Sequence, residues 1–411
     1  MNSRERVIAA VNHQQPDQVP IDFGGHRSSG IMAIAYKKLK EYLGIETGDI
    51  YVYDFIQQLA VIEPEVLQCL PSDVIDWGRG FCLRPDDWQD WVLPDGTPCK
   101  IPAYIDVVRK GNDWLAYHPD GTLIAIQKEG CLYFEQTVRP LAGKDVPPLD
   151  QLSYELQKVM WVYLAVPPGR VNYSNEAQLQ QITDGLKALR LSTDRAIIAV
   201  FGGNLNEFGQ MLYGVGEFLM MLAAEPQKVH RLFDGLLEIY LKNLEIFLSH
   251  FGPYIDIIMF ADDIGMQTGP QFSPKMYREF FHDRYKQMWT KVKKLADVKI
   301  MLHCCGGIFP LLPGLIEAGL DIVQPVQITC KDMEPEKLKQ EYGKEMCFWG
   351  GGCDTRWTLP HGTPQQVAEQ VSELVKIWSP GGGFVFQQVH NVMADVPPEN
   401  VVAMLEAVNK T

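Results

Sequence analysis

Residues 255–303 read IDIIMFADDIGMQTGPQFSPKMYREFFHDRYKQMWTKVKKLADVKIMLH, and this stretch decides the fold. The apolar runs 255–260 and 298–303 have the length and composition typical of buried strands. Between them, residues 273–296 carry apolar residues at the spacing of an amphipathic helix. A strand, a helix and a second strand in succession predict two parallel strands joined by a helical crossover.

The same alternation recurs along the chain. The candidate strands are Val19–Phe23, Asp73–Trp77, Ala196–Phe201, Ile255–Phe260, Val298–His303, Asp321–Pro325, Met346–Gly350 and Phe384–Gln388. From the third strand onward, each gap holds an amphipathic helical pattern, as in 226–251 and 364–378. Eight such units close a (β/α)8 barrel, so we predict an α/β fold of the TIM-barrel type, with residues 1–411 as one barrel domain.

Residues 78–141 break the alternation. Pro-Asp-Gly turns at 94–96 and 119–121 lie between runs of alternating aromatic and β-branched residues, which is typical of hairpins. We therefore predict a β-rich insertion after the second strand. It either covers a ligand at the barrel mouth or forms a decorative or dimerising flap, and in the latter case the protein is a homodimer.

Composition excludes several classes of protein. The chain has 411 residues, a net charge of −14 and no basic stripe, so we expect no nucleic-acid partner. No apolar run reaches the roughly 18–20 residues of a membrane span, and the first residues are charged rather than apolar. The 9 cysteines are scattered, which favours free thiols in a reducing compartment and predicts a cytoplasmic protein.

Polar side chains or glycines follow every candidate strand. In a barrel these chain segments meet at one end, where catalytic sites lie, so their convergence favours an enzyme over a passive scaffold. The candidate substrate-binding residues at these positions are His26, Arg27, Asn204, Gln327 and Gln388.

A histidine and two cysteines end the fifth candidate strand. His303 and Cys305 share one face of the strand, whereas Cys304 points to the other. An imidazole and a thiolate together favour zinc, and Cys353 in WGGGCDT is our candidate for the third ligand. Three ligands with an open fourth position are typical of a catalytic zinc site. The alternatives are that Cys330 is the third ligand, or that these cysteines are small buried apolar residues.

Three further residues are candidates for catalysis. Asp262 and Asp263 are adjacent, so only one of the two carboxylates should enter the site. The other interpretation of each is a helix N-cap or an ion pair with a barrel helix. His390 either donates a hydrogen bond in the site or stabilises its loop.

Several long motifs carry a family resemblance. They are FGGN (201–204), DIIMFADDIGMQTGPQFSPKMYREFF (256–281), LHCCGGIFPLLPGLIEAGLDIVQPVQ (302–327) and PGGGFVFQQVHNVMADVPPENVVAMLEA (380–407). Over about residues 200–409 the chain resembles the uroporphyrinogen decarboxylase superfamily, and within it the cobalamin-dependent methyltransferase branch. The resemblance implies a (β/α)8 barrel. True decarboxylases carry an arginine-rich MRQAGR-type segment, whereas residues 21–32 read IDFGGHRSSGIM with only Arg27, which argues against a porphyrinogen substrate.

The resemblance also implies an activity. In the methyltransferases a His-x-Cys pair and a later cysteine bind zinc, which corresponds to His303, Cys305 and, less closely, Cys353. The implied reaction moves a methyl group between a corrinoid (cobalamin) and a small molecule, either by O-demethylation of a methoxylated compound or by methylation of a thiol. The chain has no Asp-x-His-x-x-Gly corrinoid module, so we expect a partner corrinoid protein. The alternatives are a metal-free decarboxylase of a tetrapyrrole or related acid, and a non-catalytic corrinoid- or tetrapyrrole-binding protein.

Overall fold

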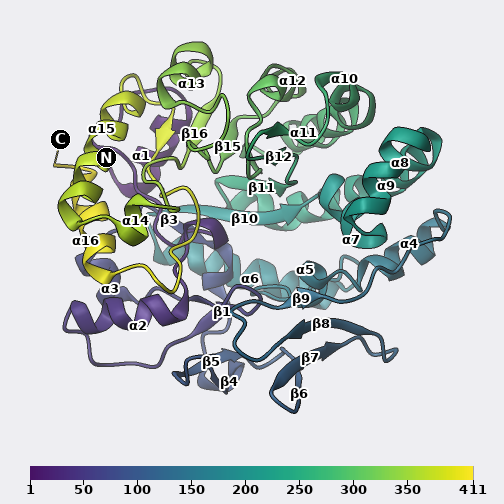
Figure 1. Ribbon diagram of the computed structural model, residues 1–411, viewed down its shortest axis with the longest axis horizontal. Helices are drawn as coiled ribbons and strands as arrows, with labels where there is room; N and C mark the ends of the chain where they lie inside the picture. Colours follow the sequence, from purple (N-terminus) through teal and green to yellow (C-terminus); the bar gives the residue numbers. More distant parts are fainter. Residues whose placement is uncertain (411) are drawn as a thin grey trace.

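The computed structural model describes residues 1–410, and a curved parallel sheet lies at its centre (Figure 1). The strand order is β17-β16-β15-β14-β11-β10-β3, and all neighbours are parallel. The strands are β3 (Val74–Asp76), β10 (Ala196–Gly202), β11 (Ile257–Ala261), β14 (Lys299–His303), β15 (Ile322–Gln324), β16 (Cys347–Trp349) and β17 (Phe384–Val385). Each lies within or close to one of the candidate strands of the sequence.

The first candidate strand, Val19–Phe23, closes the barrel without forming a regular strand. Ile21 makes an isolated parallel bridge to Phe386, just beyond β17. On its other side, the carbonyl of Ile21 accepts a hydrogen bond of 2.7 Å from the amide of Asp73, just before β3. Pro20 has no N–H to donate, which limits regular pairing in this segment. Both edges of the seven-stranded sheet are therefore bound to one segment, and the predicted TIM barrel is confirmed.

Helices cover the outside of the sheet (Figure 1). They are α6 (Glu176–Ser192), α9 (Pro226–Phe251), α10 (Pro274–Tyr277), α11 (Asp283–Leu295), α12 (Leu312–Ala318), α13 (Pro335–Tyr342), α15 (Pro364–Trp378) and α16 (Pro398–Ala407). The predicted helices 226–251 and 364–378 match α9 and α15. The predicted helix 273–296 consists of α10, a π-helical turn and α11.

The N-terminal helix closes the end of the barrel at which the strands begin. Helix α1 (Ser3–Val11) buries Val7, Ala10 and Val11 in one apolar cluster with residues that line the barrel interior, among them Met301 and Trp349. This end is therefore filled by apolar side chains, which leaves the opposite end, where the strands finish, available for a site.

The β-rich insertion predicted after the second strand is present between β3 and β10. Its strands are β4 (Trp88–Val92), β5 (Pro98–Pro102), β6 (Val108–Lys110), β7 (Asp113–Tyr117), β8 (Leu123–Gln127) and β9 (Glu135–Gln136), and they pair antiparallel. The aromatic side chains of this insertion pack against their neighbours. The ring centroids of Trp91 and Trp114 are 4.0 Å apart, and those of Trp88 and Tyr51 are 4.8 Å apart.

The remaining elements connect these layers. They are α2 (Ala33–Tyr42), β1 (Val52–Asp54), β2 (Leu59–Ala60), α3 (Pro64–Cys69), α4 (Leu149–Leu156), α5 (Met160–Tyr163), α7 (Asn206–Tyr213), α8 (Val215–Ala224), β12 (Gly265–Met266), β13 (Gly269–Pro270) and α14 (Thr358–His361). Among residues 1–410, none of the helices has the length and apolar character needed to cross a lipid bilayer.

Candidate functional site

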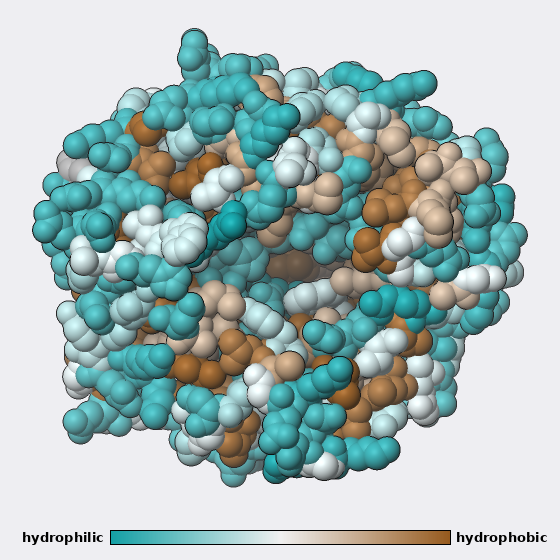
Figure 2. Space-filling model, viewed as in Figure 1, coloured by the Kyte–Doolittle hydropathy of each residue, from teal (hydrophilic) through white to brown (hydrophobic). Residues whose placement is uncertain are grey.

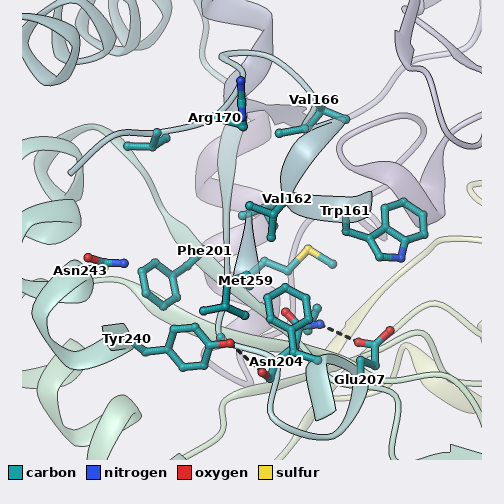
Figure 3. Close-up of a pocket in the computed structure, with 18 of the residues that line it drawn as sticks. Trp161, Val162, Val166, Arg170, Phe201, Asn204, Glu207, Tyr240, Asn243 and Met259 are labelled. Carbon is teal, nitrogen blue, oxygen red and sulfur yellow. Dashed lines mark hydrogen bonds between the residues drawn. The ribbon is translucent and has the colours of Figure 1, made fainter. Parts of the chain in front are cut away.

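A cavity of about 1140 Å³ opens at the C-terminal ends of the barrel strands. The face of the molecule in Figure 2 is hollowed near its centre, and Figure 3 shows part of the cavity wall. Six of the candidate residues line this cavity together: Arg27, Asn204, Asp263, His303, Cys305 and His390. They lie at or just beyond the ends of four different strands and of the barrel-closing segment 19–23, so only the closed barrel brings them to one place.

Three of these residues form a group of potential metal ligands. His303, Cys305 and His390 each offer one donor atom, and these atoms lie within 4.8 Å of one another. The Sγ atom of Cys305 is 3.6 Å from Nε2 of His303. The imidazole rings of His303 and His390 have centroids 6.0 Å apart. Sulfur and imidazole nitrogen are the donors that zinc prefers in proteins.

Cys353, the expected third ligand, lies outside this donor group. Cys353 is fully buried, and its Sγ lies 3.6 Å from Oε1 of Gln370 in helix α15, outside the cavity lining. Residues 350–352 are all glycine, and Gly350 and Gly351 have φ angles of 95° and 73°. This left-handed turn directs the chain after β16 so that Cys353 faces the helix layer. His390, which we expected to be catalytic or loop-stabilising, instead offers the third donor atom of the group.

The thiols next to the site differ in environment. Cys304 is buried, and its Sγ accepts a hydrogen bond of 3.4 Å from the amide of Ile264. Cys305 instead lines the cavity, where burial and the charge of Asp263 raise the pKa of its thiol. Cys330, the alternative ligand, donates to Oε1 of Gln267 and lies outside the donor group.

Both imidazoles are held neutral. Burial lowers the pKa of His303, and burial lowers the pKa of His390 to about 4. Neutral imidazoles keep a nitrogen lone pair, which metal coordination requires. The Nδ1 atom of His390 is hydrogen-bonded to Oδ1 of Asn391, which leaves its Nε2 for a ligand.

The two adjacent aspartates have different roles. Asp262 is fully buried, and its Oδ2 accepts hydrogen bonds from the amides of Leu205 and Asn206 at 2.8 and 2.9 Å. Its Oδ1 accepts from the amide of Glu207 at 2.8 Å, and Tyr285 donates to Oδ2 at 2.7 Å. Asp262 therefore caps the N-terminus of α7, which matches the alternative interpretation of this residue, and its carboxylate does not line the cavity.

Asp263 is the aspartate that faces the cavity. Its Oδ1 accepts a hydrogen bond of 2.7 Å from the amide of Cys305 and lies 3.8 Å from Nε2 of His303. A carboxylate at this place adds negative charge beside the candidate metal ligands.

Three of the expected substrate-binding residues do not line the cavity. His26 is buried, with Nε2 3.1 Å from Oδ2 of Asp22. Gln327 accepts a hydrogen bond of 2.9 Å from the amide of Gly306 and supports the loop after β14. Gln388 is buried, and neither Nε2 nor Oε1 of its side chain has a hydrogen-bond partner within residues 1–410.

Arg27 and Asn204 are the expected substrate-binding residues that do reach the cavity. Nε of Arg27 lies 2.7 Å from Oδ2 of Asp54, and its guanidinium carbon lies 4.9 Å from the ring centroid of Trp161. The carboxylate and the indole hold the guanidinium in place. Among the described residues, no acceptor is hydrogen-bonded to its terminal nitrogens.

Glu207 is a site residue that sequence reasoning missed. Its Oε2 accepts a hydrogen bond of 2.6 Å from Nδ2 of Asn204, and the same wall includes Tyr240, whose hydroxyl donates to the Asn204 carbonyl at 2.7 Å (Figure 3). Burial and the charge of Asp263 raise the pKa of the Glu207 carboxyl well above its usual range. Its position, three residues after Asn204 at a strand end, is the signal that points to it.

Comparison with known proteins identifies a family model and two curated relatives that match this chain. The family model of uroporphyrinogen decarboxylase (URO-D) matches residues 168–411, more than half of the chain. Curated uroporphyrinogen decarboxylases from Pseudoalteromonas translucida and Photorhabdus laumondii are 24% and 23% identical over 52% and 57% of this chain. The chain spans 55% and 65% of the lengths of these two relatives.

A solved structure shares the fold across the whole chain. The methyltransferase from Methanosarcina mazei aligns with 100% of this chain and 99% of its own, with a TM-score of 0.59 and 14% sequence identity. On the strength of the family-model match, the chain belongs to the uroporphyrinogen decarboxylase family.

Proposed function

We propose that the protein is a zinc-dependent methyltransferase. It would move a methyl group between a small molecule and a corrinoid carried by a partner protein. The observation that carries this proposal is the donor group itself: one cysteine sulfur and two neutral imidazoles within 4.8 Å, in the wall of a large cavity.

The donor set suits zinc. His303, Cys305 and His390 would supply three ligands and leave a fourth position for a substrate atom, as in catalytic zinc sites. Zinc, when bound, supplies a Lewis acid that lowers the pKa of a thiol or improves an ether oxygen as a leaving group.

The chain's own residues would bind and orient the substrate. The free terminal nitrogens of Arg27 would accept an anionic group of the small molecule, because a guanidinium binds carboxylates in a fork geometry. This favours a substrate that carries a carboxylate and a methoxy or thiol group. The apolar cavity wall, which includes Trp161, Val162 and Met259, would exclude water from the reacting atoms.

Glu207 would supply the proton that the reaction needs. Its raised pKa keeps a proton on the carboxyl near neutral pH, and the carboxyl lines the same cavity as Cys305. When a methyl group leaves an ether oxygen, that oxygen requires a proton, and Glu207 would donate it. In the thiol direction the proton released on zinc binding would pass to solvent, because Glu207 already carries a proton.

The size of the cavity and the ligand chemistry are consistent with a second protein component. The cavity of about 1140 Å³ is slightly larger than the roughly 300–1,000 Å³ of most small-molecule sites, and its open mouth is where a corrinoid face would approach. A free thiol and a reduced corrinoid both require a reducing compartment, which fits a cytoplasmic protein.

The direct test uses free cobalamin as the probe. The purified, zinc-loaded chain is incubated with cob(I)alamin and a series of methoxylated carboxylic acids, and methylcobalamin formation is followed by visible absorbance. The reverse direction uses methylcobalamin and small thiols. We expect turnover with the wild type and with Cys353→Ser, and loss with Cys305→Ser.

A different result would favour the decarboxylase alternative. Release of carbon dioxide from uroporphyrinogen by metal-free protein, with no methyl transfer to or from cobalamin, would contradict the proposal. The same result with Cys305→Ser would show that the thiol has no part in that reaction.

A further inference from the structure

A chain of buried polar side chains runs from Asp22 to the candidate metal ligand His303. Oδ2 of Asp22 lies 3.1 Å from Nε2 of His26, which lies 3.2 Å from Oε1 of Gln387. Nε2 of Gln324 donates to the same Oε1 at 3.0 Å, and Oε1 of Gln324 lies 2.7 Å from Nδ1 of His303. All members except His303 are fully buried. Such a connected network in the interior needs every group to be satisfied.

Two backbone groups of Ser28 determine which atom donates and which accepts in each hydrogen bond of this side-chain network. The Ser28 carbonyl can only accept, so Gln387 must donate to it from Nε2, at 3.0 Å. Oε1 of Gln387 is then an acceptor, and both His26 and Gln324 must donate to it. The Ser28 amide can only donate, and its bond of 3.2 Å to Nδ1 of His26 places the proton of His26 on Nε2, in agreement.

The same direction holds at the last link. Gln324 uses its amide nitrogen as the donor to Gln387, so only its Oε1 faces His303. An oxygen acceptor requires a proton on Nδ1 of His303. The Nε2 atom of His303 then carries a lone pair on the side of Cys305, whose Sγ is 3.6 Å away. The Ser28 hydroxyl, 3.2 Å from Nδ1, can rotate to donate or accept and does not select a tautomer.

We propose that Gln324, Gln387 and His26 are positioning residues that hold His303 in its Nδ1–H tautomer and so keep Nε2 free to bind a metal. The consequence for zinc rests on the proposed function, but the tautomer itself does not. Asp22 anchors the far end, because its Oδ2 also accepts from Nε1 of Trp349 at 2.8 Å. In metal sites such outer partners fix the ring and typically change metal affinity about 10–100-fold.

The test reads the tautomer without any metal. Side-chain ¹⁵N spectra of histidine-labelled apoprotein are recorded for wild type, Gln324→Met and Gln324→Glu, with the His303 signals identified by their loss in His303→Ala. We expect the Nδ1–H form in the wild type. Gln324→Met removes the acceptor and should give a tautomer mixture or the opposite form. Gln324→Glu keeps an acceptor oxygen and should retain the Nδ1–H form.

Zinc affinity gives the second readout. Competition with a chromophoric chelator should show binding roughly 10–100-fold weaker in Gln324→Met than in the wild type, with much of the loss recovered in Gln324→Glu. Gln388→Met is the matched control, because Gln388 is a neighbouring buried glutamine whose amide has no partner within residues 1–410. It should leave both the tautomer and the zinc affinity unchanged.

The outcomes separate this inference from the proposed function. An unchanged Nδ1–H form of His303 in Gln324→Met would overturn the inference. Thermal unfolding of the apoprotein shows whether Gln324→Met folds. If it does not, Gln387→Met is used instead, because it removes the acceptor that fixes the orientation of the Gln324 amide. An unchanged His303 tautomer in Gln387→Met would overturn the inference equally. A shifted tautomer in a protein that binds no zinc would support the inference and contradict the proposed function.

Discussion

The Sγ atom of Cys305 lies 3.6 Å from Nε2 of His303, across the intervening residue Cys304. Side chains two positions apart share one face of an extended chain, so β14 and the residues after it deliver both donors to the cavity. The thiol of Cys304 points the other way, to the amide of Ile264. This one local geometry places a thiol and an imidazole together before any other strand contributes.

Metal content should separate the ligands from the other buried thiols. We expect about one zinc per chain in the wild type, and loss or strong weakening in Cys305→Ser and His390→Ala. Cys304→Ser and Cys353→Ser should retain the metal. Elemental analysis of protein purified without an affinity tag provides the measurement. Zinc retained in His390→Ala but lost in Cys353→Ser would restore Cys353 as the third ligand.

The two neighbouring aspartates should respond differently to the same substitution. Asp262→Asn removes one of two acceptor oxygens that bind three backbone amides and a tyrosine hydroxyl, so we expect a loss of about 2–4 kcal/mol in the free energy of unfolding. Asp263→Asn should change it by less than about 1 kcal/mol, because this side chain lies at the cavity wall. Denaturant unfolding measures both variants, and equal losses would contradict the assignment.

Arg27 should set the affinity for an anionic substrate. Arg27→Met alone would leave the buried carboxylate of Asp54 unpaired, so the comparison is made in an Asp54→Asn background. In that background we expect KM for a methoxylated carboxylic acid to rise about 10–100-fold, with kcat much less affected. The corresponding methyl ester or amide should show a far smaller change. An equal change for charged and neutral substrates would contradict a carboxylate contact at Arg27.

Asp76 should make stability depend on pH. Burial raises the pKa of this carboxyl to about 7, although its Oδ1 accepts a hydrogen bond from the amide of Gly78. The folded protein therefore keeps the Asp76 proton in a range where the unfolded chain has lost it. The contribution of Asp76 to the free energy of unfolding is fully present near pH 4, falls as pH rises, and is lost above about pH 7.

The Asp76→Asn variant removes this dependence and retains the acceptor oxygen for Gly78. Relative to the wild type, we expect it to raise the free energy of unfolding by up to about 4 kcal/mol at pH 8, with a difference that shrinks toward pH 4. Denaturant unfolding at both values of pH checks the sign. A difference that grows as pH falls would show that the Asp76 carboxylate is stabilised, rather than destabilised, by its surroundings.

Much of the fold could be predicted because its signals are local. Apolar runs of strand length and helices with one apolar face identify themselves within about ten to twenty residues of sequence. The segments 226–251 and 364–378 became α9 and α15 without change. Segment 19–23 was expected to be a strand but forms only an isolated bridge, since Pro20 cannot pair regularly.

Which side chain of an adjacent pair enters the cavity was not predictable. Two such pairs lie just where strands end: Asp262 with Asp263, and Gln387 with Gln388. At a strand end, the turn that follows decides which of two adjacent side chains points to the cavity. In the folded chain, three backbone amides at the start of α7 draw Asp262 away from the cavity. Those amides come from a segment more than fifty residues earlier in the chain, so no local sequence pattern predicts their contact with Asp262.

The sequence by itself determined the barrel, the β-rich insertion and the pair of donors at His303 and Cys305, because periods of two and 3.6 residues are properties of the local backbone. Only the tertiary structure decided that His390, rather than Cys353, completes the donor group. Loops from different strands meet at distances set by barrel closure and by turns such as the one at Gly350 and Gly351. Those distances depend on the packing of the whole ring, so the third member of the donor group follows from the fold and not from the spacing of residues along the chain.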